Sequence, residues 1–138
     1  MDIFNFYKTN KKTHGNHVLI DFIWDIKEYK PNETELGNII FQIMEDGIKK
    51  TNMNIVFKKL CIFEEGKSPP GFTAFFCLDE SHASMHAYTD RGWLSFDCYT
   101  CGETDPNIIT TYVKDEITKI IPSLVCTYNK THKRFHYL

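Results

Sequence analysis

Two segments of the chain place their apolar side chains on a single helical stripe, and this pattern most restricts the folds available to it. The first stripe runs from 36 to 44 (Leu36, Ile39, Ile40, Ile43 and Met44). The second runs from 109 to 120 (Ile109, Tyr112, Val113, Ile117 and Ile120). Spacing of three and four predicts an amphipathic helix that buries one face only. Each helix must therefore lie against another layer of structure.

The sequence indicates where both helices start and where the second one ends. Asn32 precedes Glu35 by three positions, the spacing of a capping box. Asp105 followed by Pro106 predicts the start of the second helix, with the aspartate as N-cap and the proline in the first turn. Pro122 ends that helix because proline cannot continue the hydrogen-bond ladder.

The segments outside the helices have the composition of β-strands. We expect strands at His17–Trp24, Met53–Phe63, Gly71–Leu78, Trp93–Tyr99 and Leu124–Tyr128, with a further short strand at Arg134–Tyr137 left open. The polar run Asp79–His82 interrupts the series and is expected to be a turn, followed by the strand-like Ala83–Tyr88, which we do not count separately. The resulting order β-α-β-β-β-α-β predicts an α+β fold, a two-layer α/β sandwich with an antiparallel-rich sheet.

Composition narrows the functional class. A chain of 138 residues is one domain, 1–138, and its 16 basic and 18 acidic residues give a net charge of −2, which favours neither nucleic acid nor an anionic membrane as a partner. No apolar run approaches the roughly 20 residues of a membrane helix, and the N-terminus lacks the features of a signal peptide. Five cysteines, an odd number, predict a reducing compartment and a cytoplasmic protein.

A metal site formed by His82, His86, Cys98 and Cys101 is an alternative that we consider and do not favour. In a strand-like segment, side chains four positions apart lie roughly 13 Å from each other, too far to share one ion. The C-x-x-C lacks the second pair that structural zinc sites usually have. It also does not open a helix, as a thioredoxin-like motif should. We therefore expect no metal.

Three short motifs, in order along the chain, carry a resemblance. The sequence ESHASMH covers Glu80-Ser81-His82 and His86, and CYTCGETDP covers Thr100-Cys101-Gly102-Glu103 at the end of the next strand. Gly15-Asn16-His17 precedes the first strand. Together these motifs resemble the bacterial-type S-adenosylmethionine decarboxylase proenzyme family, which is pyruvoyl-dependent, and the resemblance covers roughly residues 15–122.

The resemblance implies a self-cleaving proenzyme. The chain would cut itself between Glu80 and Ser81 into chains 1–80 and 81–138, and Ser81 would become a covalent pyruvoyl group, the only cofactor. A serine suits this step because its hydroxyl can attack the preceding carbonyl and then leave from Cβ. The pyruvoyl ketone would form a Schiff base with the substrate amine and accept electrons as carbon dioxide leaves.

The resemblance also assigns roles to other side chains. Cys101 would be the proton donor, since a cysteine thiol is ordinarily protonated at neutral pH, and His86 would transfer protons during processing. Thr73 would assist processing, while Phe63 and Asp90 would contact substrate. His86-Ala87-Tyr88-Thr89-Asp90 departs from the family's His-Thr-Trp-Pro-Glu.

The implied function is decarboxylation of S-adenosylmethionine, which gives the aminopropyl donor for polyamine (spermidine) biosynthesis. Alternatives are a homologous pyruvoyl decarboxylase of arginine or ornithine, and a processing-dead or zinc-stabilised binding homologue without enzymatic activity. The family also implies a homodimer in which two sandwiches form a four-layer αββα assembly with sites at or near the interface. Ser81 and His86 would face opposite sides of a straight strand, so one site needs a turn or bulge between them.

Overall fold

The computed structural model describes residues 15–64, 66 and 68–135, and within these ranges the chain forms six strands and two helices. In chain order the elements are β1 (Asn16–Ile23), α2 (Glu33–Ile48), β2 (Ile55–Phe63), β3 (Gly71–Leu78), β4 (Ser81–Tyr88), β5 (Trp93–Thr100), α3 (Asn107–Ile120) and β6 (Val125–Lys133). The expected order is wrong in one respect. Four strands separate the helices, because 81–88 is a strand of its own.

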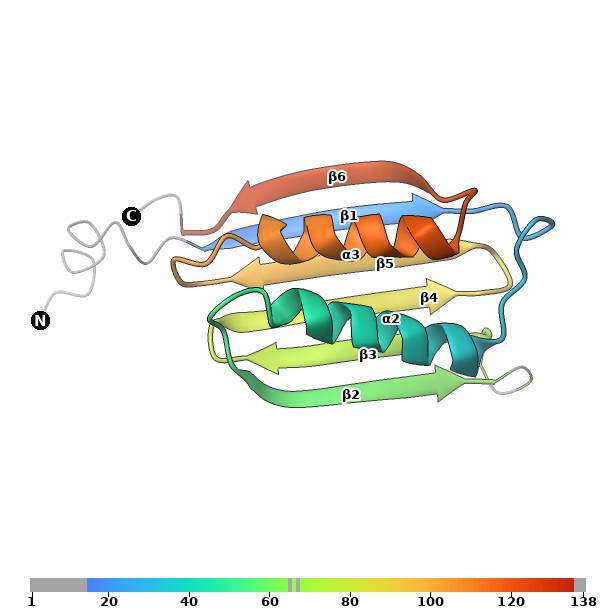
Figure 1. Ribbon diagram of the computed structural model, residues 1–138, viewed down its shortest axis with the longest axis horizontal. Helices are drawn as coiled ribbons and strands as arrows, with labels where there is room; N and C mark the ends of the chain where they lie inside the picture. The colour runs from blue at the N-terminus through green and yellow to red at the C-terminus, as the bar shows by residue number, and fades with distance from the viewer. Residues whose placement is uncertain (1–14, 65, 67, 136–138) are drawn as a thin grey trace, which may run out of the picture.

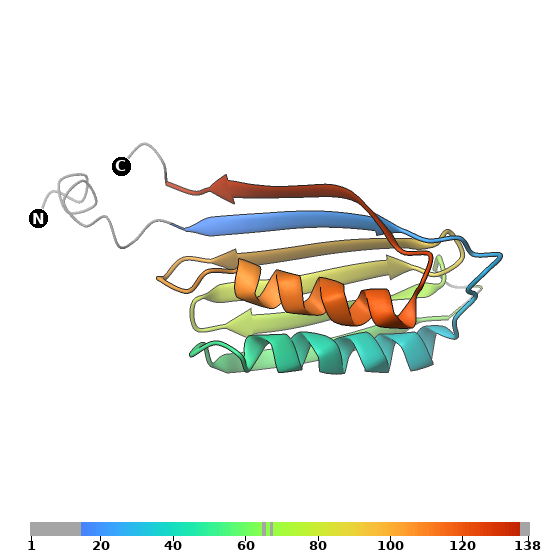
Figure 2. The same ribbon diagram turned by 45° about the horizontal axis from the view of Figure 1, so that its top comes forward.

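All six strands belong to one antiparallel sheet in the order β2-β3-β4-β5-β1-β6. Both helices cover the same face of this sheet, α2 over its β2–β3 side and α3 beside α2 (Figures 1 and 2). The predicted two-layer α/β sandwich is therefore confirmed. β1 pairs with β5 on one side and with β6 on the other, so the first strand of the chain lies between two strands from its second half.

The C-terminal strand is longer than the sequence suggested. β6 runs without interruption from Val125 to Lys133 at the edge of the sheet, where most of its residues are exposed on both faces. An edge strand exposed on both sides shows no alternation, which is why the hydrophobic pattern detected only its first residues. The expected extra strand at Arg134–Tyr137 is wrong for residues 134 and 135, and residues 136 and 137 lie outside the described residues.

The helix starts are confirmed in one case and corrected in the other. The Asn32 side chain accepts a hydrogen bond of 3.0 Å from the Glu35 backbone N–H, as the capping spacing predicted. In α3 the N-cap position is occupied by Pro106, and Asp105 lies one residue earlier. Asp105 still accepts a hydrogen bond of 3.0 Å from the Asn107 backbone N–H, so it stabilises the turn into the helix.

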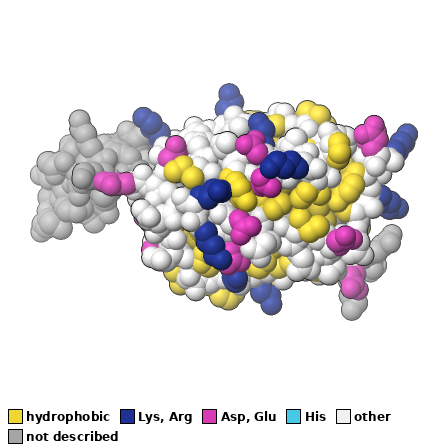
Figure 3. All heavy atoms as spheres, viewed as in Figure 1, with side chains coloured by type: hydrophobic (Ala, Val, Ile, Leu, Met, Phe, Trp, Pro, Cys, Tyr) yellow, Lys and Arg dark blue, Asp and Glu magenta, His cyan; other side chains and the backbone are white. Residues whose placement is uncertain are grey.

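The hydrophobic core lies between the helices and the sheet. Its largest fully buried side chains include Phe22, Phe72, Phe76, Phe96 and Leu36. The outer surface of the helix layer carries basic and acidic groups intermixed with hydrophobic ones (Figure 3). None of the helices in the described part of the chain is both long enough and apolar enough to cross a membrane.

The other face of the sheet is not covered by any described element, and it is unusually apolar. Large hydrophobic side chains at least one third exposed lie on its strands: Ile23, Phe57, Phe63, Phe75, Tyr88, Trp93, Val125 and Tyr128. We call this surface the open face. An apolar surface of this extent is typical of an interaction site.

Candidate functional site

The β3–β4 connection is a two-residue turn with a strained residue after it. Leu78 pairs with Ser81, so only Asp79 and Glu80 lie in the turn, and Ser81 and His82 already belong to β4. The predicted turn Asp79–His82 is therefore two residues too long. Ser81 has φ of 128°, a value that L-residues rarely adopt. A strained backbone of this kind costs roughly 1–3 kcal/mol and is frequent at functional sites.

The end of β5 lies beside this turn. The Cys101 backbone N–H donates a hydrogen bond of 2.8 Å to the Glu80 carbonyl oxygen, and Ser81 is the register partner of Thr100. Oε2 of Glu80 is buried without a hydrogen-bond partner in the described residues. A Cβ at Gly102 would overlap this carboxyl group, so a larger residue there would require the Glu80 side chain to move. The structure thus brings Glu80, Ser81 and Cys101 together, and we call these residues the turn cluster.

His86 and Thr73 form a second group on the open face. The Thr73 hydroxyl and Nδ1 of His86 share a hydrogen bond of 3.0 Å. Both side chains line a small pocket of about 140 Å³ together with Phe63. We call Phe63, Thr73 and His86 the His86 cluster. Asp90 is exposed in the turn after β4 and does not line this pocket.

The two clusters lie at different positions along β4. The strand pairs with β3 and β5 without a register shift, so it contains no bulge between Ser81 and His86. At roughly 3.4 Å per residue, five positions separate the two residues by about 17 Å. The turn or bulge that a single site would require is absent from β4. A single chain therefore does not bring all of the predicted site residues together.

The four candidate zinc ligands do not converge. His82 and His86 share one face of a regular strand, whereas Cys98 is fully buried on the helix side. Burial, with smaller contributions from the nearby carboxylates of Asp97 and Asp105, raises the pKa of the Cys98 thiol to about 12. Cys101 is exposed beyond the end of β5. The C-x-x-C is therefore not a ligand pair in this fold.

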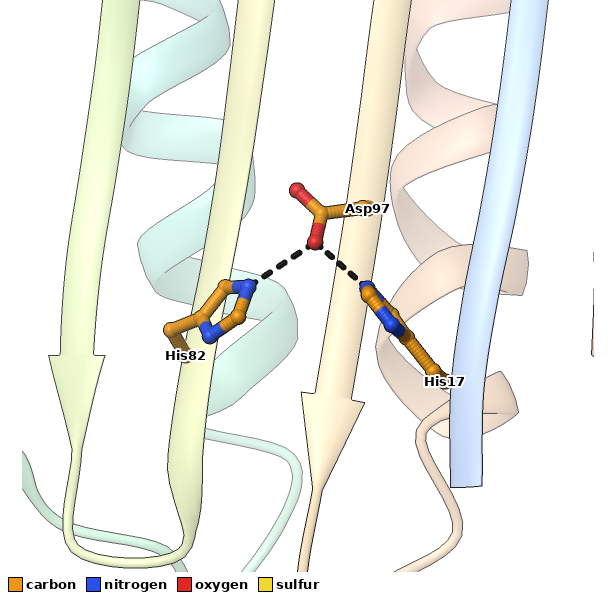
Figure 4. Close-up of side chains that lie close together, drawn as sticks. All are labelled: His17, His82 and Asp97. Carbon is orange, nitrogen blue, oxygen red and sulfur yellow. Dashed lines mark hydrogen bonds and ion pairs between the residues drawn. The ribbon is translucent and has the colours of Figure 1, made fainter. Parts of the chain in front are cut away.

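A group that the sequence did not predict lies on the open face at the turn end of the sheet. His17 of β1 and His82 of β4 both point at Asp97 of β5 (Figure 4). Their Nε2 atoms lie 2.7 and 2.8 Å from the same oxygen, Oδ2 of Asp97, and the Ser84 hydroxyl donates to Oδ1. We call His17, His82 and Asp97 the histidine–aspartate cluster.

Asp97 is held as a carboxylate. Burial acts to raise the pKa of this carboxyl, but the hydrogen bonds from His82, Ser84 and His17 outweigh it and lower the pKa to about 2. The three cluster residues all occupy open-face positions of their strands, and this alternation was visible in the sequence. Their proximity was not, because it depends on β1 pairing with β5 across about 80 residues of chain.

Comparisons with known proteins agree with this geometry. The S-adenosylmethionine decarboxylase family profile matches residues 16–120. The S-adenosylmethionine decarboxylase proenzyme of Brevibacillus brevis is 34% identical over 102 residues, covering 73% of this chain and 71% of that protein. That of Bacillus velezensis is 29% identical over 110 residues, covering 77% and 78%.

A solved structure shares the fold over most of its length. The crystal structure of the adenosylmethionine decarboxylase from Aquifex aeolicus VF5 matches with a TM-score of 0.59 and 26% identity, over 89% of this chain and 90% of that one. Sequence, fold and the motifs around Ser81 and Cys101 all lead to the same assignment: the chain belongs to the S-adenosylmethionine decarboxylase family.

Proposed function

We propose that the chain is a proenzyme that cuts itself between Glu80 and Ser81 and then decarboxylates S-adenosylmethionine with a pyruvoyl group made from Ser81. The observation that carries this proposal is the geometry of the scissile bond. Ser81 has a strained φ of 128°, and the carbonyl that its hydroxyl would attack already accepts a hydrogen bond from the Cys101 N–H.

That hydrogen bond has a direct role in the cleavage chemistry. When the Ser81 oxygen adds to the Glu80 carbonyl carbon, negative charge develops on the carbonyl oxygen, and a fixed N–H at 2.8 Å stabilises it. The Glu80–Ser81 amide bond then breaks as an ester forms. Loss of the Ser81 Cα proton breaks the ester, leaves a carboxylate on Glu80 and a dehydroalanine at residue 81, and hydrolysis with release of ammonia gives the keto group.

The residues of the turn cluster fit a pyruvoyl group at position 81. The group supplies an electron sink for decarboxylation. Cys101 lies next to it at the end of β5 and would deliver a proton to the substrate carbon that has lost carbon dioxide. Oε2 of Glu80, which is buried and has no hydrogen-bond partner among the described residues, belongs to the residue before the same bond, so cleavage would release a buried, unsatisfied oxygen.

The substrate assignment follows the relatives, which are S-adenosylmethionine decarboxylase proenzymes. The product would be the aminopropyl donor for polyamine (spermidine) synthesis. Phe63 lines the pocket beside His86, and its aromatic ring would stack on the adenine ring of the substrate. All five cysteines are free, which fits a reducing, cytoplasmic compartment.

We further propose that the working enzyme is a homodimer whose sheets pack open face to open face, as four αββα layers. Two observations support it: the apolar open face, and the separation of about 17 Å between Ser81 and His86. In such a dimer the turn cluster of one subunit would meet the His86 cluster of the second subunit. Each site would then contain every required group although no single subunit does.

Intact-mass spectrometry of the purified full-length protein tests the cleavage. We expect chains of roughly 9 and 7 kDa, because the 16.2 kDa of the 138-residue chain divide in proportion to 80 and 58 residues, with the smaller chain carrying a keto group in place of its amine. Ser81→Ala should stay at full length. Ser84→Ala, three residues along the same strand, is the matched control for a serine without this role. A wild-type chain that stays uncut with an unmodified serine would refute the proposal.

Carbon dioxide release from labelled substrates tests the specificity. We expect release from S-adenosylmethionine and none from arginine or ornithine. Release from either amino acid alone would reassign the substrate and favour the alternative of a basic amino acid decarboxylase. A cleaved protein that releases nothing from any of the three would indicate a binding homologue.

Mixing two inactive subunits tests the shared site. Co-expressed Ser81→Ala and His86→Ala chains should recover about a quarter of the wild-type activity per site, because random pairing makes half of the dimers mixed and one of the two composite sites in each mixed dimer is intact. Each variant alone should be inactive. Failure of the mixture to regain activity, in a preparation shown to contain mixed dimers, would contradict the shared site.

A further inference from the structure

The histidine–aspartate cluster lies one residue from the proposed cleavage site, and neither cleavage nor decarboxylation as described above uses it. His82 is bonded directly to residue 81. Its side chain, with those of Asp97 and His17, connects three neighbouring strands, β4, β5 and β1, on the open face (Figure 4). The rings of His17 and His82 also flank Tyr99, with centroids 5.4 and 6.0 Å from the tyrosine ring.

The hydrogen-bonding chemistry of the cluster specifies where its protons are. An ionised carboxylate only accepts hydrogen bonds, so both Nε2 atoms must donate to Asp97. Arg134, which only donates, approaches Nδ1 of His17 at 3.5 Å, so that nitrogen is an acceptor. His17 is therefore the Nε2–H tautomer. Separations of 2.7 and 2.8 Å are those of charge-assisted hydrogen bonds.

A metal ion does not fit these proton positions. The donor atoms of His17, His82 and Asp97 lie within 4.8 Å of one another, as metal ligands do. A metal would need the lone pair of each Nε2, and His17 would then carry its proton on Nδ1, facing the Arg134 guanidinium. Hydrogen bonds from the two Nε2–H groups to Asp97 therefore suit this cluster better than a bound metal ion does.

Cleavage would change what holds the start of β4. In the uncut chain the Asp79–Glu80 turn ties β4 to β3. After the proposed cleavage, residue 81 is a chain end, held by the strand ladder and by the first intact side chain, which is that of His82. Asp97 lies on β5, four residues before Cys101. The His82–Asp97 hydrogen bond therefore ties the new chain end to the strand that leads into the proposed proton donor.

We propose that Asp97 is a positioning residue that holds His82, and through it the keto group formed at residue 81, in register with Cys101. The inference rests on the proposed function. It assigns Asp97 no contact with substrate. Loss of the carboxylate should leave cleavage intact and misplace the reacting group, and a misplacement of about 1 Å can cost a hundred-fold in rate.

The kinetic test uses full-length Asp97→Ala and Asp97→Asn proteins, with Asp21→Ala as a matched control for an open-face aspartate outside the cluster. We expect all three to self-cleave. Asp97→Ala should lose about ten- to a hundred-fold in kcat with little change in KM, and Asp97→Asn, whose amide oxygen still accepts from the histidines, should recover most of the loss. His82→Gln, whose amide N–H can reach Asp97, should behave like Asp97→Asn.

A second measurement does not depend on activity. Long-range ¹H–¹⁵N spectra of histidine side chains should show His17 and His82 as Nε2–H tautomers in the wild-type protein, cut or uncut. Tautomers with the proton on Nδ1, or stoichiometric zinc in the purified protein, would overturn the inference.

Different results would refute the proposed function and the positioning role of Asp97. An uncut wild-type chain with the expected tautomers would refute the proposed function and leave the hydrogen-bonded cluster standing. Cleaved Asp97→Ala with wild-type kcat, a raised KM at unchanged kcat, or a folded Asp97→Ala protein that stays uncut would each refute the positioning role alone.

Discussion

The strain at Ser81 can be measured as a stability difference between two variants that cannot self-cleave. Ser81→Ala and Ser81→Gly both lack the hydroxyl, so both remain uncut. Only glycine adopts φ of 128° without penalty. Relief of roughly 1–3 kcal/mol of strain, less the roughly 0.5–1 kcal/mol that glycine costs in a strand, should leave the glycine variant more stable by about 0–2.5 kcal/mol, centred at about 1.25 kcal/mol.

Urea denaturation at matched protein concentration is the assay. With an m-value of about 2 kcal/mol/M, the Ser81→Gly midpoint should lie roughly 0–1.25 M above that of Ser81→Ala, centred at about 0.6 M. Ser95 on β5 provides the control, because its φ is not positive and it is exposed. There glycine should be less stable than alanine. If glycine is also the less stable residue at position 81, the bond before Ser81 is not strained as described.

Three further predictions concern groups around the site. Hydrogen bonds lower the pKa of Asp97 to about 2, so its carboxylate should contribute about 2 kcal/mol to the free energy of unfolding. This contribution should be present above pH 4 and lost as pH falls through 2. The urea midpoints of the wild-type and Asp97→Asn proteins should therefore converge in acid. Iodoacetamide should modify the exposed Cys101 in the native protein but Cys98 only after unfolding, because Cys98 is buried and burial raises the pKa of its thiol to about 12. Peptide mass mapping measures the modification of both cysteines. Gly71→Ala would push a Cβ into the Ala87 backbone carbonyl between β3 and β4, so thermal unfolding should show a loss of about 2 kcal/mol or more.

The sequence predicted local structure well where one residue type decides it. Gly71–Leu78 was predicted with its observed bounds, because an uninterrupted apolar run between a proline loop and a polar turn leaves little choice. Asn32 caps α2 as expected, since a side-chain acceptor three residues before a backbone N–H is a local interaction. The prediction of Asp105 as the N-cap of α3 is wrong by one residue, because Pro106 occupies that position.

The sequence proposes individual site residues and does not show how they are arranged. The motif ESHASMH predicts roles for Ser81 and His86, and the straight, bulge-free β4 shows that the two residues lie far apart along the strand. The positive φ of Ser81 depends on a two-residue turn, whereas the polar run Asp79–His82 predicted a turn of four residues. The histidine–aspartate cluster needs the β1–β5 pairing, and sequence patterns do not give the pairing of distant strands.

The strand order determines what would hold the two chains together after the proposed cleavage. Chain 1–80 would keep β1, β2 and β3, and chain 81–138 would keep β4, β5 and β6. In the order β2-β3-β4-β5-β1-β6, three of the five strand ladders then join one piece to the other. The pieces are interleaved and cannot drift apart without unfolding. Once unfolded they must find each other again, so refolding becomes a second-order reaction that slows on dilution, whereas the uncut precursor refolds at a rate independent of concentration.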